Sequence, residues 1–70
     1  MSTNTQIENW FTYHAPNADQ QGRYEILRRK AKELAYTIDD CCPDSADKTV
    51  AIRKLRECIM TANASIALGG

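Results

Sequence analysis

The sequence has few of the features that stabilise small proteins through covalent bonds or metals. It has three cysteines, an odd number, and two of them, Cys41 and Cys42, are neighbours; the third is Cys58. No Cys-x-x-Cys or Cys-x-x-His pair gives the spacing of a zinc site. We therefore expect three reduced thiols, as in a cytosolic protein, with neither a disulfide nor a structural metal.

The sequence has no long apolar run, and we expect no signal peptide. The first residues, MSTNTQIEN, are polar and have neither the basic start nor the apolar centre of a signal peptide. No apolar run approaches the roughly 18 residues of a membrane span, so we expect no membrane association. A chain of 70 residues is marginally stable by itself, which leaves self-association as the expected means of stabilisation.

The charges show no overall excess of either sign. Nine basic residues balance nine acidic ones, which argues against binding to long nucleic acid. Their distribution is uneven, because residues 23–32 contain five basic residues and one acidic residue, whereas residues 39–47 contain four acidic residues and no basic one. The basic stretch would attract a compact anionic ligand although the whole chain is neutral.

No group of residues has the pattern of an enzyme site. His14 is the only histidine, and no serine or cysteine is placed by pattern as its nucleophilic partner. The four acids of residues 39–47 lack the spacing of a calcium loop, so we interpret them as a solvated turn. There is no glycine-rich phosphate loop. We predict a binding protein that is not an enzyme and has no cofactor.

Two stretches, residues 18–41 and 44–68, have a strong helical pattern. In each, apolar residues recur three and four apart and form one stripe of an α-helix. The stripes are Tyr24, Leu27, Ala31, Leu34 and Ile38 in the first stretch, and Ile52, Leu55, Ile59, Ala62 and Ile66 in the second. The few residues between the stretches allow only an antiparallel turn.

The ends of these helices also have recognisable signals. Asn17 followed by Gln20 has the form of a capping box. Asp44 or Ser45 is expected to cap the second helix. The pair Gly69-Gly70 is expected to end it.

Residues 1–16 are predicted to form a short helix and an extended connector. Thr3 and Gln6 have the spacing of a cap, and Pro16 disfavours helix at the residue before it. The expected fold is therefore all-α, a single domain with a short N-terminal helix followed by a long antiparallel αα-hairpin. Several apolar residues lie outside both stripes and favour an oligomer: Ile26, Tyr36, Val50, Cys58 and Met60.

Aromatic and basic residues form the most promising candidate site. The dipeptide Tyr13-His14 precedes the first long helix, and Arg28 and Lys32 are four apart, hence on one face of that helix. In the hairpin, Lys32 is expected roughly opposite Arg53 or Lys54. A tyrosine ring can stack on a nucleobase, and cations hold phosphate. From the residues alone, a solubilising charged face with core aromatics is the alternative.

Several separate blocks of the sequence, spanning about residues 11 to 68, occur together in one known family. They are FTYHAP at 11–16, Gln20, Tyr24-x-x-Leu27-Arg28, AKELA at 31–35, CP at 42–43, SAD at 45–47, AIRKLRE at 51–57 and MTANASIA at 60–67. The set resembles the phage anti-CBASS cyclic-nucleotide sponges. Their hairpin is shared with one group of anti-Thoeris sponges, but the chain lacks the extra β-rich domain of that group.

The resemblance implies a hexamer of helical hairpins that binds cyclic dinucleotides in pockets shared by two subunits. A tyrosine stacks on the base and a basic residue holds the phosphate. Carried over by position, these are Tyr13 and Arg28, with Lys32 as the second choice. Some members also bind cyclic trinucleotides at three-fold positions, for which Arg53 is a candidate. The expected ligand-binding residues also include Phe11 and His14.

The function that the resemblance implies is sequestration. The chain would bind cyclic dinucleotides such as cyclic GMP–AMP, and also cyclic trinucleotides, in the host bacterial cytoplasm without cleaving them, and so block CBASS-type defence. The alternative is a helical oligomerisation or protein-interaction module with no small-molecule ligand. A phosphodiesterase is a further rival, against which the missing metal ligands argue.

Overall fold

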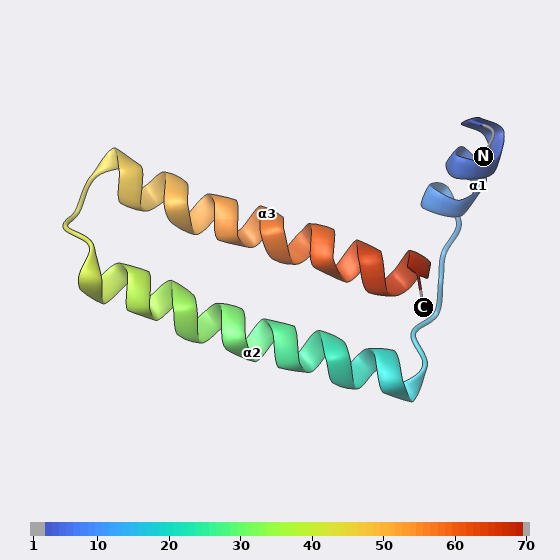
Figure 1. The fold of residues 1–70 in the computed structure, drawn as a ribbon, viewed down its shortest axis with the longest axis horizontal. Helices are drawn as coiled ribbons and strands as arrows, with labels where there is room; N and C mark the ends of the chain where they lie inside the picture. Colours follow the sequence, from blue (N-terminus) through green and yellow to red (C-terminus); the bar gives the residue numbers. More distant parts are fainter. Residues whose placement is uncertain (1–2, 70) are drawn as a thin grey trace.

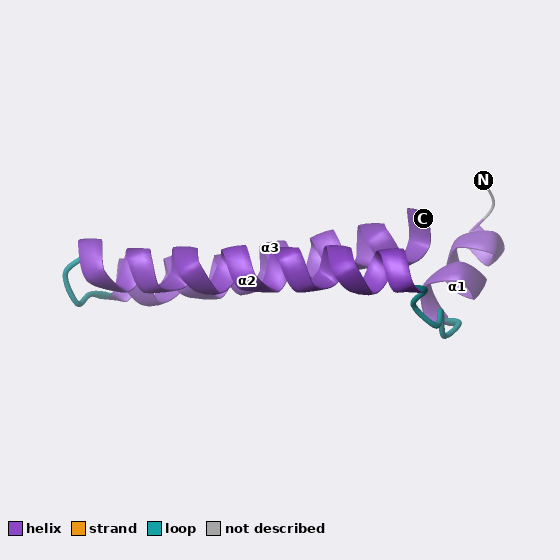
Figure 2. Cartoon of the chain, turned by 90° about the horizontal axis from the view of Figure 1, so that it is seen from below, coloured by secondary structure: helices purple, strands orange, loops and turns teal. Residues whose placement is uncertain are grey.

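The computed structural model describes residues 3–69 and contains three helices: α1 (Thr3–Phe11), α2 (Ala18–Cys41) and α3 (Ala46–Gly69). Helices α2 and α3 run antiparallel along each other, and α1 lies at the open end of this hairpin (Figure 1). The hairpin is a single layer of helices when seen from below (Figure 2), and the chain measures 45 × 28 × 15 Å. Residues 3–69 contain no strand, so the prediction of an all-α fold is confirmed.

Helix α2 has the ends that its sequence predicts. The capping box is present: Asn17 Oδ1 accepts a hydrogen bond from the Gln20 N–H at 2.8 Å, and Gln20 Oε1 accepts one from the Asn17 N–H at 3.0 Å. At the other end Cys42 is extended (φ −104°, ψ 135°), and its N–H still donates to the Ile38 carbonyl at 3.0 Å. The helix stops there because Pro43 disfavours the helical conformation at the residue before it.

Helix α3 differs from its predicted range of 44–68 at both ends. It begins at Ala46, because Ser45 is the residue that caps it: Ser45 Oγ accepts from the Lys48 N–H at 3.1 Å. Asp44 is outside the helix and accepts instead from Lys48 Nζ, at 2.9 Å. Gly69 is the last described residue of the helix, and Gly70, the other half of the expected stop, lies outside the described residues.

The N-terminal segment has the predicted short helix and connector. Thr3 is already helical, so it does not cap α1 from outside as expected, and residues 1 and 2 lie outside the described part of the chain. Two hydrogen bonds fold the start of the connector back onto α1. Thr12 Oγ1 donates to the Glu8 carbonyl, and His14 Nε2 lies 2.8 Å from the Asn9 carbonyl oxygen.

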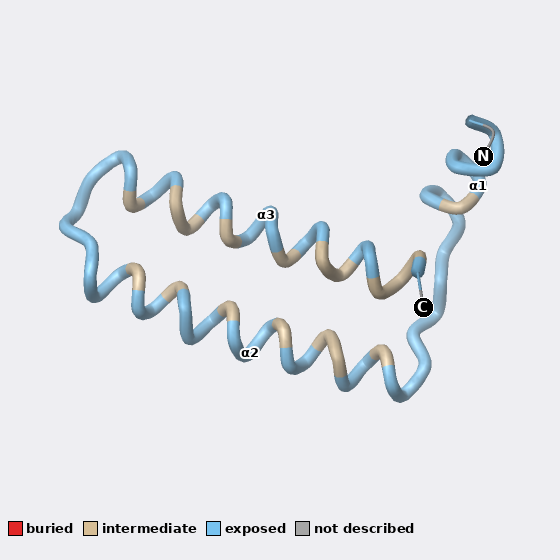
Figure 3. The backbone as a smooth tube through the Cα atoms, in the orientation of Figure 1, coloured by how far each residue is buried: buried red, intermediate tan, exposed pale blue. Residues whose placement is uncertain are grey.

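The partly covered residues line the facing sides of α2 and α3 (Figure 3). They include the whole predicted stripe of α3 and that of α2 except Leu34, which is 48% exposed. Ala35 takes its place in the covered row. Adjacent residues of a helix point about 100° apart, so the rotation of α2 about its axis decides which of the two faces α3.

The single chain leaves much apolar surface uncovered. None of residues 3–69 is buried. Large exposed apolar residues occur on all three helices and in the connector: Ile7, Trp10, Phe11, Tyr13, Ile26, Leu34, Tyr36, Val50 and Met60. An apolar surface of this kind is typical of proteins that associate.

Candidate functional site

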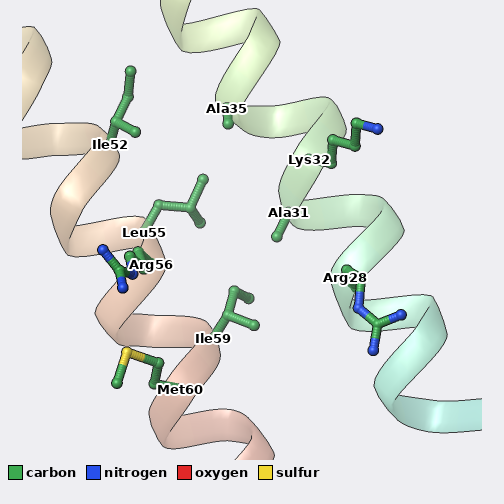
Figure 4. Close-up of a pocket in the computed structure, with 9 residues that line it drawn as sticks. All are labelled: Arg28, Ala31, Lys32, Ala35, Ile52, Leu55, Arg56, Ile59 and Met60. Carbon is green, nitrogen blue, oxygen red and sulfur yellow. The ribbon is translucent and has the colours of Figure 1, made fainter. Parts of the chain in front are cut away.

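An open groove of about 290 Å³ lies between α2 and α3 in the middle of the hairpin (Figure 4). Leu55 and Ile59 extend from α3 toward α2, and Ala31 faces them, so the floor is apolar. Lys32 points away from α3 along the edge of α2. The lining residues are Arg28, Ala31, Lys32, Ala35, Ile52, Leu55, Arg56, Ile59 and Met60.

Three cations border this groove. Arg28 and Lys32 lie one helical turn apart on α2, and Arg56 lies on α3. None of the described residues that line the groove is acidic. Guanidinium and ammonium groups are the side chains that hold phosphate, and an apolar floor suits the flat face of a base. The groove can therefore accept an anionic ligand with aromatic rings.

The structure brings Arg28 and Lys32 together and adds a residue that sequence reasoning missed. Arg56 was not among the expected site residues, because no neighbouring sequence feature distinguishes it from the other basic residues of α3. Its signal was its place beside Leu55, a residue of the apolar stripe, which puts it at the border of the inter-helix face.

The aromatic candidates lie elsewhere in the chain. Phe11 ends α1, and Tyr13 and His14 belong to the connector beyond the open end of the hairpin (Figure 1). Arg28 is ten residues, or about 15 Å of helix, beyond the first residue of α2. Tyr13 is 83% exposed. Within one chain the connector aromatics do not line the basic groove.

Arg53 lies on a different surface of α3. It lines a second groove of about 320 Å³ with Arg56, Glu57 and Met60. Arg53 does not line the groove of Arg28 and Lys32. Arg56 borders both grooves, so the two surfaces meet along its side chain.

The acidic turn is held by a lysine. Lys48 Nζ lies 2.8 Å from Asp39 Oδ1 on α2 and 2.9 Å from Asp44 Oδ1 in the turn, and the Lys48 side chain is only 11% exposed. The hydrogen bond from Lys48 lowers the pKa of Asp44, and the hydrogen bonds to Asp39 and Asp44 raise the pKa of Lys48. These two carboxylates pair with Lys48 while their side chains stay 59% and 99% exposed, so the turn is solvated and also held by an ion pair.

Within residues 3–69, no three side chains of the types His, Cys, Asp and Glu are grouped so that they could hold a metal ion. None of the described helices combines the length and apolar character that crossing a membrane requires. Cys41, Cys42 and Cys58 are exposed free thiols.

Comparison with known proteins identifies the family. The sequence model of the Acb2/Tad1 hairpin domain matches residues 3–67. The chain therefore belongs to this family, the anti-CBASS and anti-Thoeris sponges, whose function at family level is to bind cyclic nucleotides. Comparison with curated proteins and with solved structures gives no match.

Proposed function

We propose that this chain sequesters cyclic dinucleotides such as cyclic GMP–AMP, and cyclic trinucleotides, without cleaving them, and so blocks CBASS-type defence in the cytoplasm of the host bacterium. The observation that carries the proposal is the groove with an apolar floor whose lining includes Arg28, Lys32 and Arg56. Such a groove suits a ring with two phosphates and two bases, and the family binds ligands of this class.

The active form in this proposal is a homo-oligomer, with a hexamer as the expected size. Two observations support association. The single chain has no buried residue within 3–69, and its connector aromatics do not line the groove that holds Arg28. A pocket shared by two copies would place Tyr13 of one beside Arg28 of the other. Association would therefore supply both the missing core and the missing half of the site.

The residues then have distinct roles. Tyr13 stacks on a base, and its high exposure leaves the ring free for this purpose. Arg28 is the first choice for the phosphate contact and Lys32 the second. Phe11 and His14 lie beside Tyr13 at the same pocket. The separate groove of Arg53 and Arg56 is the candidate for a cyclic trinucleotide. Sequestration needs only affinity and abundance, so no catalytic group is required.

One other function is favoured by a specific observation. The exposed apolar residues on all three helices would equally suit a helical oligomerisation or protein-interaction module with no small-molecule ligand. This alternative predicts a stable oligomer whose grooves stay empty.

Native mass spectrometry of the chain with cyclic GMP–AMP and cyclic tri-adenylate tests the proposal. We expect an oligomer that carries bound cyclic nucleotide, and intact ligand after the complex is denatured by heat. Linear GMP and AMP products would contradict sequestration. An oligomer that binds neither compound in this experiment or in isothermal titration would favour the interaction module, and an unliganded monomer would contradict both functions.

A further inference from the structure

A further groove, of about 280 Å³, lies on α2 nearer the turn. Lys32, Tyr36 and Asp39 line it together with Ala35 and Ile52. The three polar residues are spaced four and three apart on α2, so they lie on one face of the helix in a row. The proposed function uses Lys32 as a second choice for phosphate and gives Tyr36 and Asp39 no part in ligand binding.

Tyr36 provides a stacking surface in this groove. Its side chain is 62% exposed, although a tyrosine ring is largely apolar. Ala35 and Ile52 supply a small apolar floor beside it. An exposed ring next to an apolar floor is suited to a planar nucleobase, because bases of any kind stack on aromatic side chains.

Asp39 provides a fixed acceptor at one end of the row. Lys48 Nζ lies 2.8 Å from its Oδ1 and orients the carboxylate, yet the Asp39 side chain stays 59% exposed. A carboxylate has two oxygens with about four acceptor positions, so it can accept further hydrogen bonds. Guanine presents two adjacent donors, N1–H and the N2 amino group, that match such an acceptor. Adenine presents one donor next to an acceptor and matches it less well.

The charges along α2 give the groove a direction. Lys32 ends the basic stretch of residues 23–32, and Asp39 begins the acidic stretch of residues 39–47. Seven residues of helix separate them, a rise of roughly 10.5 Å, which suits the length of a purine mononucleotide from phosphate to base edge. A ligand with an anionic end and a hydrogen-bond-donating end would therefore bind in one orientation.

We propose that Lys32, Tyr36 and Asp39 form a guanine-nucleotide site: Lys32 binds the phosphate, Tyr36 stacks on the base and Asp39 accepts the N1–H and N2–H hydrogen bonds. All three residues come from one helix of one chain. The site therefore needs no second copy of the chain, although it shares Lys32 with the groove of Arg28.

Titration of the chain with 5′-GMP and with 5′-AMP, followed by NMR, tests this site. We expect GMP to shift the Tyr36 ring resonances and to bind about tenfold more tightly than AMP, because only guanine pairs both donors with the carboxylate. Tyr36→Leu should weaken GMP binding about tenfold or more, whereas Tyr36→Phe should keep it, because stacking needs the ring and not the hydroxyl. Because Tyr36 is exposed in the single chain, we expect both variants to keep the hairpin.

Asp39→Asn should abolish the preference for GMP, so that GMP and AMP bind with about equal affinity. The reason is that the amide offers a donor where guanine needs an acceptor. Lys48→Met is the matched control: it removes the same ion pair and its orienting effect but leaves the carboxylate, so it should reduce the preference less than Asp39→Asn does. Equal affinity for the two nucleotides, retained binding in Tyr36→Leu, or equal effects of Asp39→Asn and Lys48→Met would each overturn the assignment.

Discussion

Gln20 at the start of α2 donates a hydrogen bond from Nε2 to the carbonyl oxygen of Ile66 near the end of α3, at 3.2 Å and across 46 residues of sequence. The same side chain accepts the Asn17 N–H through Oε1, so one residue both caps α2 and joins the two helices. At the turn, Lys48 and Asp39 make a corresponding link at 2.8 Å. The basic groove of Arg28 lies between these two polar links.

The two roles of Gln20 can be separated by substitution. Gln20→Glu keeps an oxygen for the capping box but cannot donate to the Ile66 carbonyl, and should lower the free energy of unfolding by about 1 kcal/mol. Gln20→Ala loses both hydrogen bonds and should be less stable than Gln20→Glu. Urea unfolding followed by circular dichroism measures both. A Gln20→Glu variant as stable as the wild type would show that the link to Ile66 contributes nothing.

The capping box should contribute to stability through Asn17. Asn17→Ala removes the acceptor of the Gln20 N–H and should cost about 1 kcal/mol, which lowers the Tm of a domain this size by roughly 4–8 °C. Asn17→Ser is the control, because serine is an equally good N-cap, and its Tm should stay within a few degrees of the wild type. Equal Tm values for the alanine and serine variants would contradict a capping role.

Acid should weaken the turn through Asp44. Its folded pKa lies below the ordinary value of 3.8, since Lys48 donates a hydrogen bond to the charged form. The stabilisation by Asp44 is therefore complete when the pH lies above its ordinary pKa. It is lost as the pH falls through that pKa toward the lowered pKa of the folded protein. Tm should decrease between about pH 5 and pH 3, and less so in Lys48→Met. Identical pH profiles for the wild type and Lys48→Met would exclude this linkage.

The ion pair of Lys48 should also make stability depend on pH in the alkaline range. The folded pKa of Lys48 is raised above 10.5, so its contribution is complete below that value and is lost as the pH rises beyond it.

Asp44→Asn is the control for the acid side. It should flatten the acid decrease in Tm that belongs to Asp44 and keep the pairing of Lys48 with Asp39.

Tyr13 should be required for binding of cyclic dinucleotides if the proposed function is correct. Tyr13→Ala should weaken binding of cyclic GMP–AMP about tenfold or more, because a stacked base contributes about 1–3 kcal/mol. Tyr13→Phe keeps the ring and should bind nearly as well. Isothermal titration measures the affinities, and circular dichroism with native mass checks helicity and assembly. Unchanged affinity in Tyr13→Ala would remove this residue from the site.

Reversal of charge at Arg28 should weaken binding by bringing a carboxylate next to phosphate. Arg28→Glu should lose more affinity than Arg28→Lys, which keeps the charge but not the planar fork of the guanidinium. Wild-type binding should also weaken as salt is raised, because the contact is electrostatic. If Arg28→Glu binds normally and Lys32→Glu does not, Lys32 is the phosphate residue.

The helices and their caps could be predicted from the sequence because they depend on short-range spacing. The range of α2 and its Asn17–Gln20 capping box follow from residues within one or two turns of each other. The later start of α3 shows the limit of this reasoning, since Asp44 and Ser45 are both good caps by residue type. Asp44 instead pairs with Lys48, and Ser45 caps the helix.

The contacts between helices could not be predicted in the same way. Leu34 has the correct spacing for the apolar stripe, yet Ala35 is the residue that is partly covered. Likewise, Arg56 borders the groove of Arg28 and Lys32, whereas Arg53 lies on another surface. These outcomes depend on how far each helix is rotated against the other, which is set by all the packed side chains together.

The amino-acid sequence by itself determined that this protein is helical, where α2 lies, and to which family the chain belongs, because helix periodicity, capping and family motifs are all written in local order. Only the tertiary structure decided which basic residues share a groove and which lysine holds the turn. It also decided that Tyr13 does not line the groove of Arg28 within one chain. Those relations depend on the rotation and register of two helices packed against each other, which residues distant in sequence set together.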